Sequence, residues 1–239
     1  INSFKKYNFK NYLALDRKKF DITKDINKLD KIIKGYKPTH IINCLALTGL
    51  VQCEKKVSYA YEINAFFPLK LAELTKDKKI FFIHFSTDAV FDGLKKKKIY
   101  SETDSPNPQS VYGKSKYLAD EFLSSYKNVL IIRLPLLFGP TNEKQIIGKL
   151  KSRLSLNKKV QASTDIYSTP VYTPNLAKFV LFEIVIKKKF NGKKIIHFTS
   201  NKYLSIYDLI KKISKNLGCE HLVLKVKDSF FKSEVKKPR

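Results

Sequence analysis

The chain has 239 residues, of which 43% are hydrophobic, which is enough for one sizeable core or for one core with a smaller lobe. Its net charge is +26, but only 4 of its 47 basic residues are arginines. Proteins that recognise bases and phosphates specifically usually use arginine, so this composition argues against such recognition. The lysines are spread along the whole chain, so we expect an anionic small-molecule substrate and no nucleic-acid partner.

Cysteine usage and hydropathy favour a cytoplasmic location. Cys44, Cys53 and Cys219 show no Cys-x-x-Cys spacing, which argues against a disulfide framework and a zinc site, and we expect no bound metal. No apolar run reaches about 18 residues, the length of a membrane span. The longest candidate, VLIIRLPLLF, is interrupted by Arg133 and Pro135, so we expect no membrane association.

Up to Gly139, apolar runs typical of buried strands alternate with stretches of helical spacing. The expected strands are residues 12–15 (YLAL), 40–47 (HIINCLAL), 79–86 (KIFFIHFS) and 128–139 (NVLIIRLPLLFG). The expected helices are residues 24–36, stopped by Gly35; 58–77, opened by Ser58 and kinked or broken at Pro68; and 110–126, opened by Ser110. Apolar strands separated by helices predict an α/β fold with a parallel sheet covered on both faces.

The pattern becomes less regular after Gly139, which predicts a smaller second lobe. The expected elements are helices at 141–160, 176–188 and 205–218, the last ended by Gly218, a loop at 161–175 and a strand at 193–201. We therefore expect one domain at 1–139 and a second at 140–239, a segment of which could rejoin the sheet of the first.

Two Tyr-x-x-x-Lys pairs occur, Tyr112 with Lys116 and Tyr207 with Lys211. The spacing places both side chains on one helix face, where an ammonium would lower the pKa of the phenol and make it a usable acid or base. With this many lysines, the spacing alone cannot choose between the pairs. Tyr207 lies in an ordinary amphipathic helix, so we interpret its pair as structural.

The Tyr112 pair has a more informative context, because it follows a strand that ends in Ser86, Thr87 and Asp88. In a parallel sheet, ligands gather outside the carboxyl ends of the strands. The hydroxyl groups at this strand end and the phenol of Tyr112 could therefore reach the same bound atom.

Several segments resemble the extended short-chain dehydrogenase/reductase family, and within it the dTDP-4-dehydrorhamnose reductase group. The segments are FSTDAVFDG (85–93), YSETDSPNP (100–108), VYGKSKYLADE (111–121), ALDRKKFDIT (14–23), residues 38–65, RLPLLFGP (133–140) and STDIYSTPVYTPNLAKF (163–179). They keep the order and the distances of the family over most of the chain. The resemblance implies a Rossmann-type doubly wound parallel sheet with a smaller α/β substrate lobe, and NADPH or NADH as the cofactor.

The resemblance also implies roles for individual residues. Tyr112 would protonate the 4-keto oxygen of a nucleotide-activated deoxysugar, Lys116 would lower the pKa of Tyr112 and hold the nicotinamide ribose, and Thr87 would bind the keto oxygen. The substrate contacts would be Thr87, Asp88 and Ala89. The remaining cofactor contacts would be Asp16, Arg17, Asp21, Ile22, Asn43, Leu45, Ala46, Thr48 and Ser86. Asn64 would pack behind the site.

Other interpretations of single residues remain open. Asp21 could simply cap the following helix, Asn43 could satisfy backbone groups between strands, and Thr48 carries no signal of its own. His84 alternates with Phe85 on a strand, which is more typical of a hydrogen-bonded core histidine than of a catalytic one. Glu102 and Asp104 are interpreted as turn acids.

The chain departs from the family pattern at three places. Ala89 stands where the family has tyrosine and Ser168 where it has glycine, so the identity of the sugar stays open. The glycine-rich turn that holds the pyrophosphate is not in the chain, which has no methionine and opens on INSFKK. We expect a fragment that lacks roughly twenty N-terminal residues and some residues after Arg239, and that binds dinucleotides more weakly than the completed chain.

The favoured function is reduction of a dTDP-4-keto-6-deoxy sugar for surface-polysaccharide synthesis. Two alternatives remain: a UDP-sugar epimerase or reductase of the same family, and a non-catalytic NADP-binding regulatory subunit like that of methionine adenosyltransferase. Intact Tyr112, Lys116 and Thr87 favour an enzyme. The resemblance leaves a homodimer and a magnesium requirement open, although no residue pattern here predicts a metal site.

Overall fold

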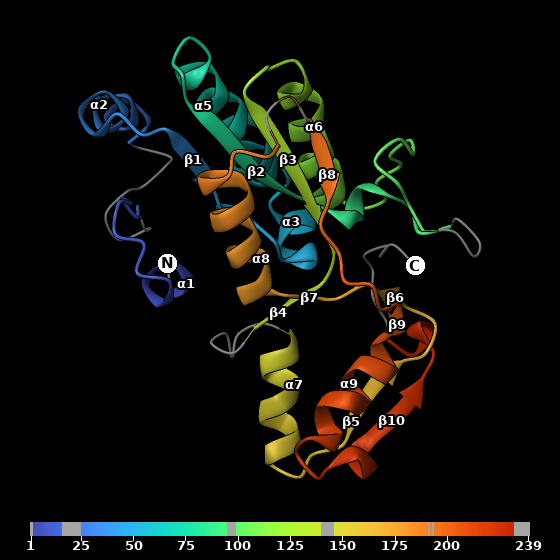
Figure 1. Ribbon diagram of the computed structural model, residues 1–239. Helices are drawn as coiled ribbons and strands as arrows, with labels where there is room; N and C mark the ends of the chain where they lie inside the picture. Colours follow the sequence, from blue (N-terminus) through green and yellow to red (C-terminus); the bar gives the residue numbers. More distant parts are fainter. Residues whose placement is uncertain are drawn as a thin grey trace.

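A four-stranded parallel sheet organises the structure, a computed structural model that describes residues 2–15, 25–94, 99–139, 146–190, 192 and 194–231. Its strands, in spatial order, are β1 (His40–Asn43), β2 (Phe81–Thr87), β3 (Val129–Leu134) and β8 (Ile195–His197). Every neighbouring pair is parallel (Figure 1). The predicted α/β class with a parallel sheet is therefore confirmed.

Helices cover both faces of this sheet, as the continuous apolar strands require (Figure 1). Helices α2 (Ile26–Tyr36), α5 (Phe67–Thr75) and α6 (Val111–Ser124) lie on one face. Helix α8 (Thr173–Phe179) and the π-helical segment Val180–Ile186 that continues it lie on the other. Successive side chains of β2 pack on opposite faces of the sheet. Phe82 packs with α2, α5 and α6, while Ile83 packs with α8.

The long helix predicted at 58–77 is observed as a helical run from Val57 to Thr75 that contains a π-helical segment. Helices α3 (Leu50–Lys55) and α4 (Val57–Tyr61) are followed by a π-helical segment, Glu62–Phe66, and then by α5. Pro68 stands in the first turn of α5, directly after the π-helical segment. A wider turn there accommodates a residue that has no N–H and whose ring would crowd the carbonyl four residues earlier. Ser58 does not cap α4, which begins one residue before it.

Other predicted boundaries also shift. Residues 12–15 form no strand, and Gly35 lies inside α2, whose C-terminus is set by Lys37 in the left-handed region at φ 48°. The strand predicted at 128–139 is divided around Pro135 into β3 and β4 (Leu137–Phe138). Strand β1 is shorter than predicted and only partly buried, because within the described residues it pairs on one side alone.

The second lobe has its own small core and lies beside the sheet domain (Figure 1). Helix α9 (Ile206–Lys215) and α7 (Ile146–Ser155) pack around the parallel pair β5 (Val160–Ser163) and β10 (Val223–Val226). The remaining short elements are β6 (Tyr167–Ser168), β7 (Val171–Tyr172), β9 (Leu204–Ser205) and the 3-10 turns Glu220–Leu222 and Asp228–Phe230. The prediction of a loop at 161–175 is wrong in part, because β6, β7 and most of β5 lie in this segment.

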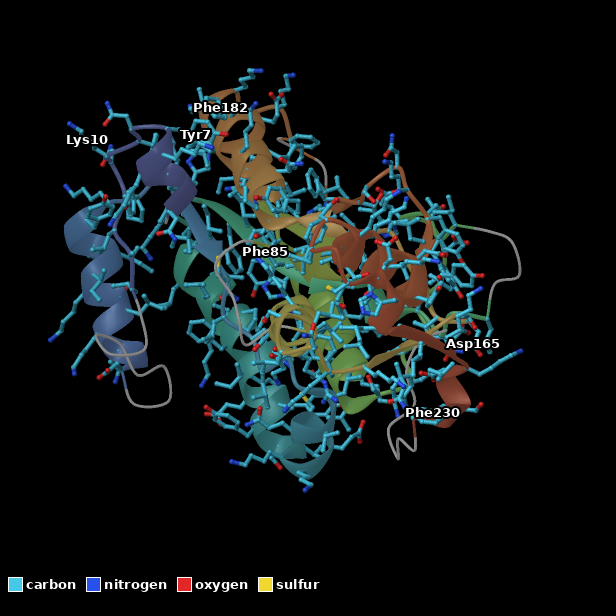
Figure 2. The ribbon with its side chains drawn as sticks, turned by 90° about the horizontal axis from the view of Figure 1, so that it is seen from below. Tyr7, Lys10, Phe85, Asp165, Phe182 and Phe230 are labelled. Carbon is cyan, nitrogen blue, oxygen red and sulfur yellow. The ribbon has the colours of Figure 1, made fainter. Side chains whose placement is uncertain are left out.

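The segment at the start of the chain packs on the α8 side of the sheet. Helix α1 (Asn2–Lys6) contacts α8, and the ring of Tyr7 lies edge-on to that of Phe182, with ring centroids 5.0 Å apart (Figure 2). In the part of the chain that the structure describes, no helix is both long and apolar enough to cross a membrane.

Candidate active site

The carboxyl end of β2 presents the first element of the site. The hydroxyl of Thr87 accepts a hydrogen bond from the Ala89 N–H at 3.1 Å and donates one to Asp88 Oδ1 at 3.2 Å. It thereby caps a single 3-10 turn, Asp88–Val90. These two bonds fix the Thr87 hydroxyl at the end of the strand, where a parallel sheet of this class binds its ligands.

Helix α6 brings Tyr112 to the same place. The hydroxyl of Ser110 accepts a hydrogen bond from the Gly113 N–H at 3.1 Å, which confirms Ser110 as the N-cap. At Gly113 the helix rests against the turn so closely that an added Cβ would lie 2.3 Å from the Ala89 carbonyl oxygen. The Tyr112 phenol lies close enough to Thr87 for that side chain to lower its pKa, so the structure brings these two predicted residues together.

Lys116 is fully buried and turns toward β2. Its Nζ donates a hydrogen bond to the Phe85 carbonyl at 2.6 Å and lies 2.9 Å from His84 Nε2. Burial lowers the pKa of Lys116 to about 8, an effect that the nearby Asp120 carboxylate opposes. The amine is therefore held by the strand under the helix.

The expected lowering of the Tyr112 pKa is not found. Tyr112 is half-buried, and desolvation raises its pKa to about 12, a rise that the Thr87 side chain offsets only in part. Asp88, Cys53 and Asp120 add to the rise through their negative charges. The physical reason is that desolvation of the phenolate outweighs the neighbours that favour it.

His84 and Asn43 extend the polar group behind Lys116. The two residues are register partners on β2 and β1, and Asn43 Nδ2 lies 3.2 Å from His84 Nδ1. Asn43 Oδ1 accepts a hydrogen bond from the Leu45 N–H at 3.0 Å. His84 is thus a buried, hydrogen-bonded core histidine as interpreted from the sequence, but its partner is the candidate catalytic lysine.

Asn64 holds the segment that follows β1. Its Oδ1 accepts from the Leu47 N–H at 2.8 Å, and its Nδ2 donates to the Leu47 carbonyl and to the Ser115 hydroxyl, each at 3.0 Å. The fully buried amide therefore ties this segment to the residue beside Lys116. Of the expected cofactor contacts on this segment, Leu45 and Ala46 are half-buried and Thr48 is exposed.

The expected substrate residues differ in their accessibility. Ala89 is buried beneath the first turn of α6, while Asp88 is exposed. Surrounding protein raises the pKa of Asp88 to about 6, but because the residue is open to solvent, water offsets much of this rise. The expected adenosine contacts, Asp16, Arg17, Asp21 and Ile22, lie outside the described residues.

An ion pair that the sequence gave no reason to expect lies next to the site. Arg133 Nε on β3 is 2.9 Å from Asp120 Oδ2 on α6, and both side chains are buried. Burial raises the pKa of Asp120 despite Arg133, Ser86 and Lys116, all of which favour its carboxylate. Asp120 stands four residues after Lys116, the helical spacing that could have indicated a shared face.

The remaining predicted residues lie elsewhere. Tyr207 is in the core of the second lobe with Lys211 Nζ 5.6 Å from its ring centroid, as expected for a structural pair. Asp104 accepts hydrogen bonds from Ser101 within a turn, whereas Glu102 accepts one from the His197 N–H of β8 at 2.7 Å. Among the described residues no cluster of three or more His, Cys, Asp or Glu side chains could hold a metal ion.

A pocket of about 300 Å³ lies apart from the Tyr112 group. Its lining includes Pro170, Val171, Tyr172 and Asn175, which belong to the segment 163–179 that resembles a sugar-nucleotide lobe. The other lining residues are Phe138, Phe198, Thr199, Ser200, Lys202, Leu204 and Leu209. None of the residues predicted for catalysis lines this pocket.

The chain is similar to known reductases over nearly its whole length. It is 35% identical to a dTDP-4-dehydrorhamnose reductase of Aggregatibacter actinomycetemcomitans over 82% of this chain and 67% of that protein. A solved structure of a dTDP-4-dehydrorhamnose reductase ortholog from Clostridium acetobutylicum has a TM-score of 0.88 at 28% identity, covering 99% of this chain and 83% of that one. The fold also matches dTDP-4-dehydrorhamnose reductase from Bacillus anthracis in complex with NADP, with a TM-score of 0.86 at 24% identity over 95% of this chain and 78% of that one.

These similarities agree with the site geometry, in which Thr87, Tyr112 and Lys116 meet at the carboxyl end of a Rossmann-type sheet. The family described as RmlD substrate binding domain matches residues 2–239. The chain therefore belongs to this family.

Proposed function

We propose that this protein reduces the 4-keto group of a nucleotide-activated deoxysugar with NADPH or NADH, and that a dTDP-4-keto-6-deoxy sugar is its substrate. The observation that carries the proposal is the proximity of the Thr87 and Tyr112 side chains at the end of β2, beside the buried amine of Lys116. The relatives named as dTDP-4-dehydrorhamnose reductases, and the neighbour of the same fold that holds NADP, support the substrate class and the cofactor.

The described residues fit the nicotinamide half of a dinucleotide. The buried polar groups of Thr87 and Lys116 stand at the end of β2, and the segment that follows β1 runs beside them. When bound, the cofactor supplies a hydride to the C4 carbon of the sugar. Lys116 would hold the nicotinamide ribose, and Leu45 and Ala46 would lie along the ring.

Tyr112 and Thr87 provide the other half of the reaction. As the C4–O double bond becomes a single bond, the Tyr112 O–H would donate its proton to the oxygen, and the Thr87 hydroxyl would turn its hydrogen from Asp88 Oδ1 to the same oxygen. A phenol with a pKa of about 12 is fully protonated at neutral pH, which is the form that a reduction needs at its start. The product is a hydroxyl group at C4.

The sugar nucleotide would reach the second lobe. The pocket lined by Tyr172, Asn175 and Lys202 combines an aromatic ring, an amide and a cation, which suits a base and a diphosphate. Location in the cytoplasm and a homodimer stay predictions. Cys44, Cys53 and Cys219, all within the described residues, carry free thiols, which is consistent with a reducing compartment.

The test is NADPH oxidation by the full-length protein with dTDP-4-keto-6-deoxy sugars, followed by the absorbance of NADPH. Tyr112→Phe is expected to lower kcat by about 10²–10⁴-fold, because general acid catalysis is lost. Tyr207→Phe makes the same chemical change in the other Tyr-x-x-x-Lys pair and should keep the wild-type rate.

Three other outcomes would each favour a different interpretation. Full activity of Tyr112→Phe would remove Tyr112 as the acid. Tight NADPH binding by the wild-type protein without turnover of any 4-keto sugar nucleotide would favour the regulatory-subunit alternative. Turnover of UDP-sugars but not of dTDP-sugars would favour the other enzyme of the same family.

A further inference from the structure

Lys116, Arg133 and Asp120 are buried together beside the site, which places two basic side chains next to one acidic side chain. We infer that Asp120 is a positioning residue of the site: its carboxylate, paired with Arg133, is the counter-charge that keeps the buried side chain of Lys116 an ammonium. The inference rests on the proposed function for the role of Lys116, but not for its charge.

The hydrogen-bond partners of Lys116 carry no charge of their own. Its Nζ donates to the Phe85 carbonyl at 2.6 Å and lies 2.9 Å from His84 Nε2. The imidazole is neutral, because its complete burial lowers the pKa of His84 well below the ordinary value. Neutral partners can accept hydrogen bonds from an ammonium but do not balance its charge, and a buried cation without a counter-charge tends to lose its proton. An ammonium at this position therefore needs an anion nearby.

Asp120 is placed to supply that charge. It stands four residues after Lys116 on α6, a spacing that puts two side chains on one helix face with their Cβ atoms roughly 5–6 Å apart. Each of the two residues is 1% exposed, so little water screens their attraction. The effect is reciprocal: against the opposing effect of burial, Asp120 raises the pKa of Lys116 and Lys116 lowers that of Asp120.

The ion pair with Arg133 holds this carboxylate in its charged form. Arg133 Nε on β3 lies 2.9 Å from Asp120 Oδ2. Burial raises the pKa of Asp120, whereas the guanidinium, which stays charged at all relevant pH values, favours the carboxylate. An unpaired carboxyl group at this depth would take up a proton, and Lys116 would then lose its counter-charge.

The size of the Lys116 shift agrees with this arrangement. Full burial alone can lower the pKa of a lysine to about 5–6. In Lys116 the Asp120 carboxylate opposes the effect of burial, and the pKa falls only to about 8. A pKa of about 8 corresponds to about ten ammonium groups for each neutral amine at pH 7. Lys116 is therefore mainly an ammonium at neutral pH.

The other ionisable groups around Lys116 are neutral, exposed or cationic. On α6, Tyr112 keeps its proton, because desolvation raises its pKa to about 12. On α3, burial raises the pKa of Cys53 to about 11, so its thiol is neutral as well. Glu54 on α3 and Asp88 after β2 are exposed, and water screens the charge of an exposed carboxylate. Asp120 is therefore the buried anion on which the charge of Lys116 depends.

The test is NMR of the full-length protein labelled with ¹³C-lysine and ¹³C-aspartate, without substrate. The Lys116 Cε resonance should titrate with a midpoint of about 8. The double variant Asp120→Asn with Arg133→Met removes both members of the ion pair, so it leaves neither charge unpaired, and should lower this midpoint by about one pH unit or more. Asp120→Glu keeps the charge and should keep the midpoint close to the wild-type value. Glu121→Gln removes the same charge from the next residue of α6, which is exposed, and should leave the midpoint unchanged.

The wild-type protein provides a measurement that needs no variant. The Asp120 Cγ resonance should shift with its own ionisation in acid and again, by a smaller amount, at the midpoint of Lys116. Absence of this second step, a wild-type Lys116 midpoint below about pH 7, or a midpoint that the double variant leaves unchanged would overturn the inference. No reaction is involved in these measurements. The counter-charge would therefore stand if Tyr112→Phe kept full activity, and the reductase would stand if the double variant left Lys116 unchanged.

Discussion

A close contact at Gly113 positions Tyr112, the proposed catalytic acid, and Gly113→Ala tests that contact. A Cβ at this residue would lie 2.3 Å from the Ala89 carbonyl oxygen and 3.1 Å from Pro108 Cβ. The nearest obstacle is backbone, so the first turn of α6 and the turn Asp88–Val90 must separate by about 1 Å to restore ordinary contact. Tyr112, the preceding residue, moves with the helix.

This displacement determines how much the free energy of unfolding decreases in the variant. Overpacking of this kind costs about 1–3 kcal/mol, and the better helix propensity of alanine returns up to about 1 kcal/mol. A net loss of about 1–2 kcal/mol should lower the melting temperature by about 2–8 °C, given about 2–4 °C per kcal/mol for a chain of this size. A displacement of about 1 Å at the acid should lower kcat by about 10²-fold.

Thermal unfolding and urea titration measure the loss of stability, and NADPH oxidation measures the fall in kcat. Gly35→Ala in α2 is the matched control, because no atom lies within 4 Å of its added Cβ. It should stabilise the protein by about 0.5–1 kcal/mol and leave the rate unchanged. If Gly113→Ala melted at or above the wild-type temperature and kept its rate, α6 would not rest on this turn and the reasoning would be refuted.

Three further variants test the frame of the site and the second lobe. Asn64→Ala should lower the free energy of unfolding by about 2–4 kcal/mol in urea, because both backbone groups of Leu47 lose their partner; no change would show that the amide is not needed. Arg133→Met should cost about 3–5 kcal/mol at neutral pH by leaving Asp120 buried and unpaired. Since a raised folded pKa makes the carboxyl stabilising only while it is protonated, this loss should shrink at about pH 5 and grow at about pH 8, and a pH-independent loss would contradict it. Ser205→Ala should cost about 1 kcal/mol, since it removes the bond from the Asp208 N–H that caps α9; an unchanged melting curve would speak against the cap.

The fold class could be predicted from the sequence because the strands of a doubly covered sheet must be apolar on both sides. Phe82 and Ile83 show this directly, since these adjacent residues pack into the cores on opposite faces of the sheet. Boundaries were less predictable, because they depend on tertiary contacts. The two-residue strands β6 and β7 are too short to show a period, and the π-helical segment before Pro68 has no signature in hydropathy.

The candidate site could be predicted only in part, for a similar reason. Tyr112 and Thr87 were predicted from their place in a motif, and the structure brings them together. The direction of Lys116 depends on which side of β2 faces α6, and helical spacing alone contains no such information. His84 was interpreted as a core residue for its burial, which is correct, but the sequence does not show that its partner is a lysine.

The ionisation of Tyr112 determines which direction of the proposed proton transfer the resting protein is ready for. An epimerase of this family must first oxidise its sugar, and for that step the phenol has to act as a base in its ionised form. Burial raises the pKa of Tyr112 to about 12, so the phenol keeps its proton at neutral pH. A reductase needs the opposite form, a protonated phenol that can donate its proton to the carbonyl oxygen. The phenol is therefore in the protonated form from which a reduction starts, in agreement with keto reduction.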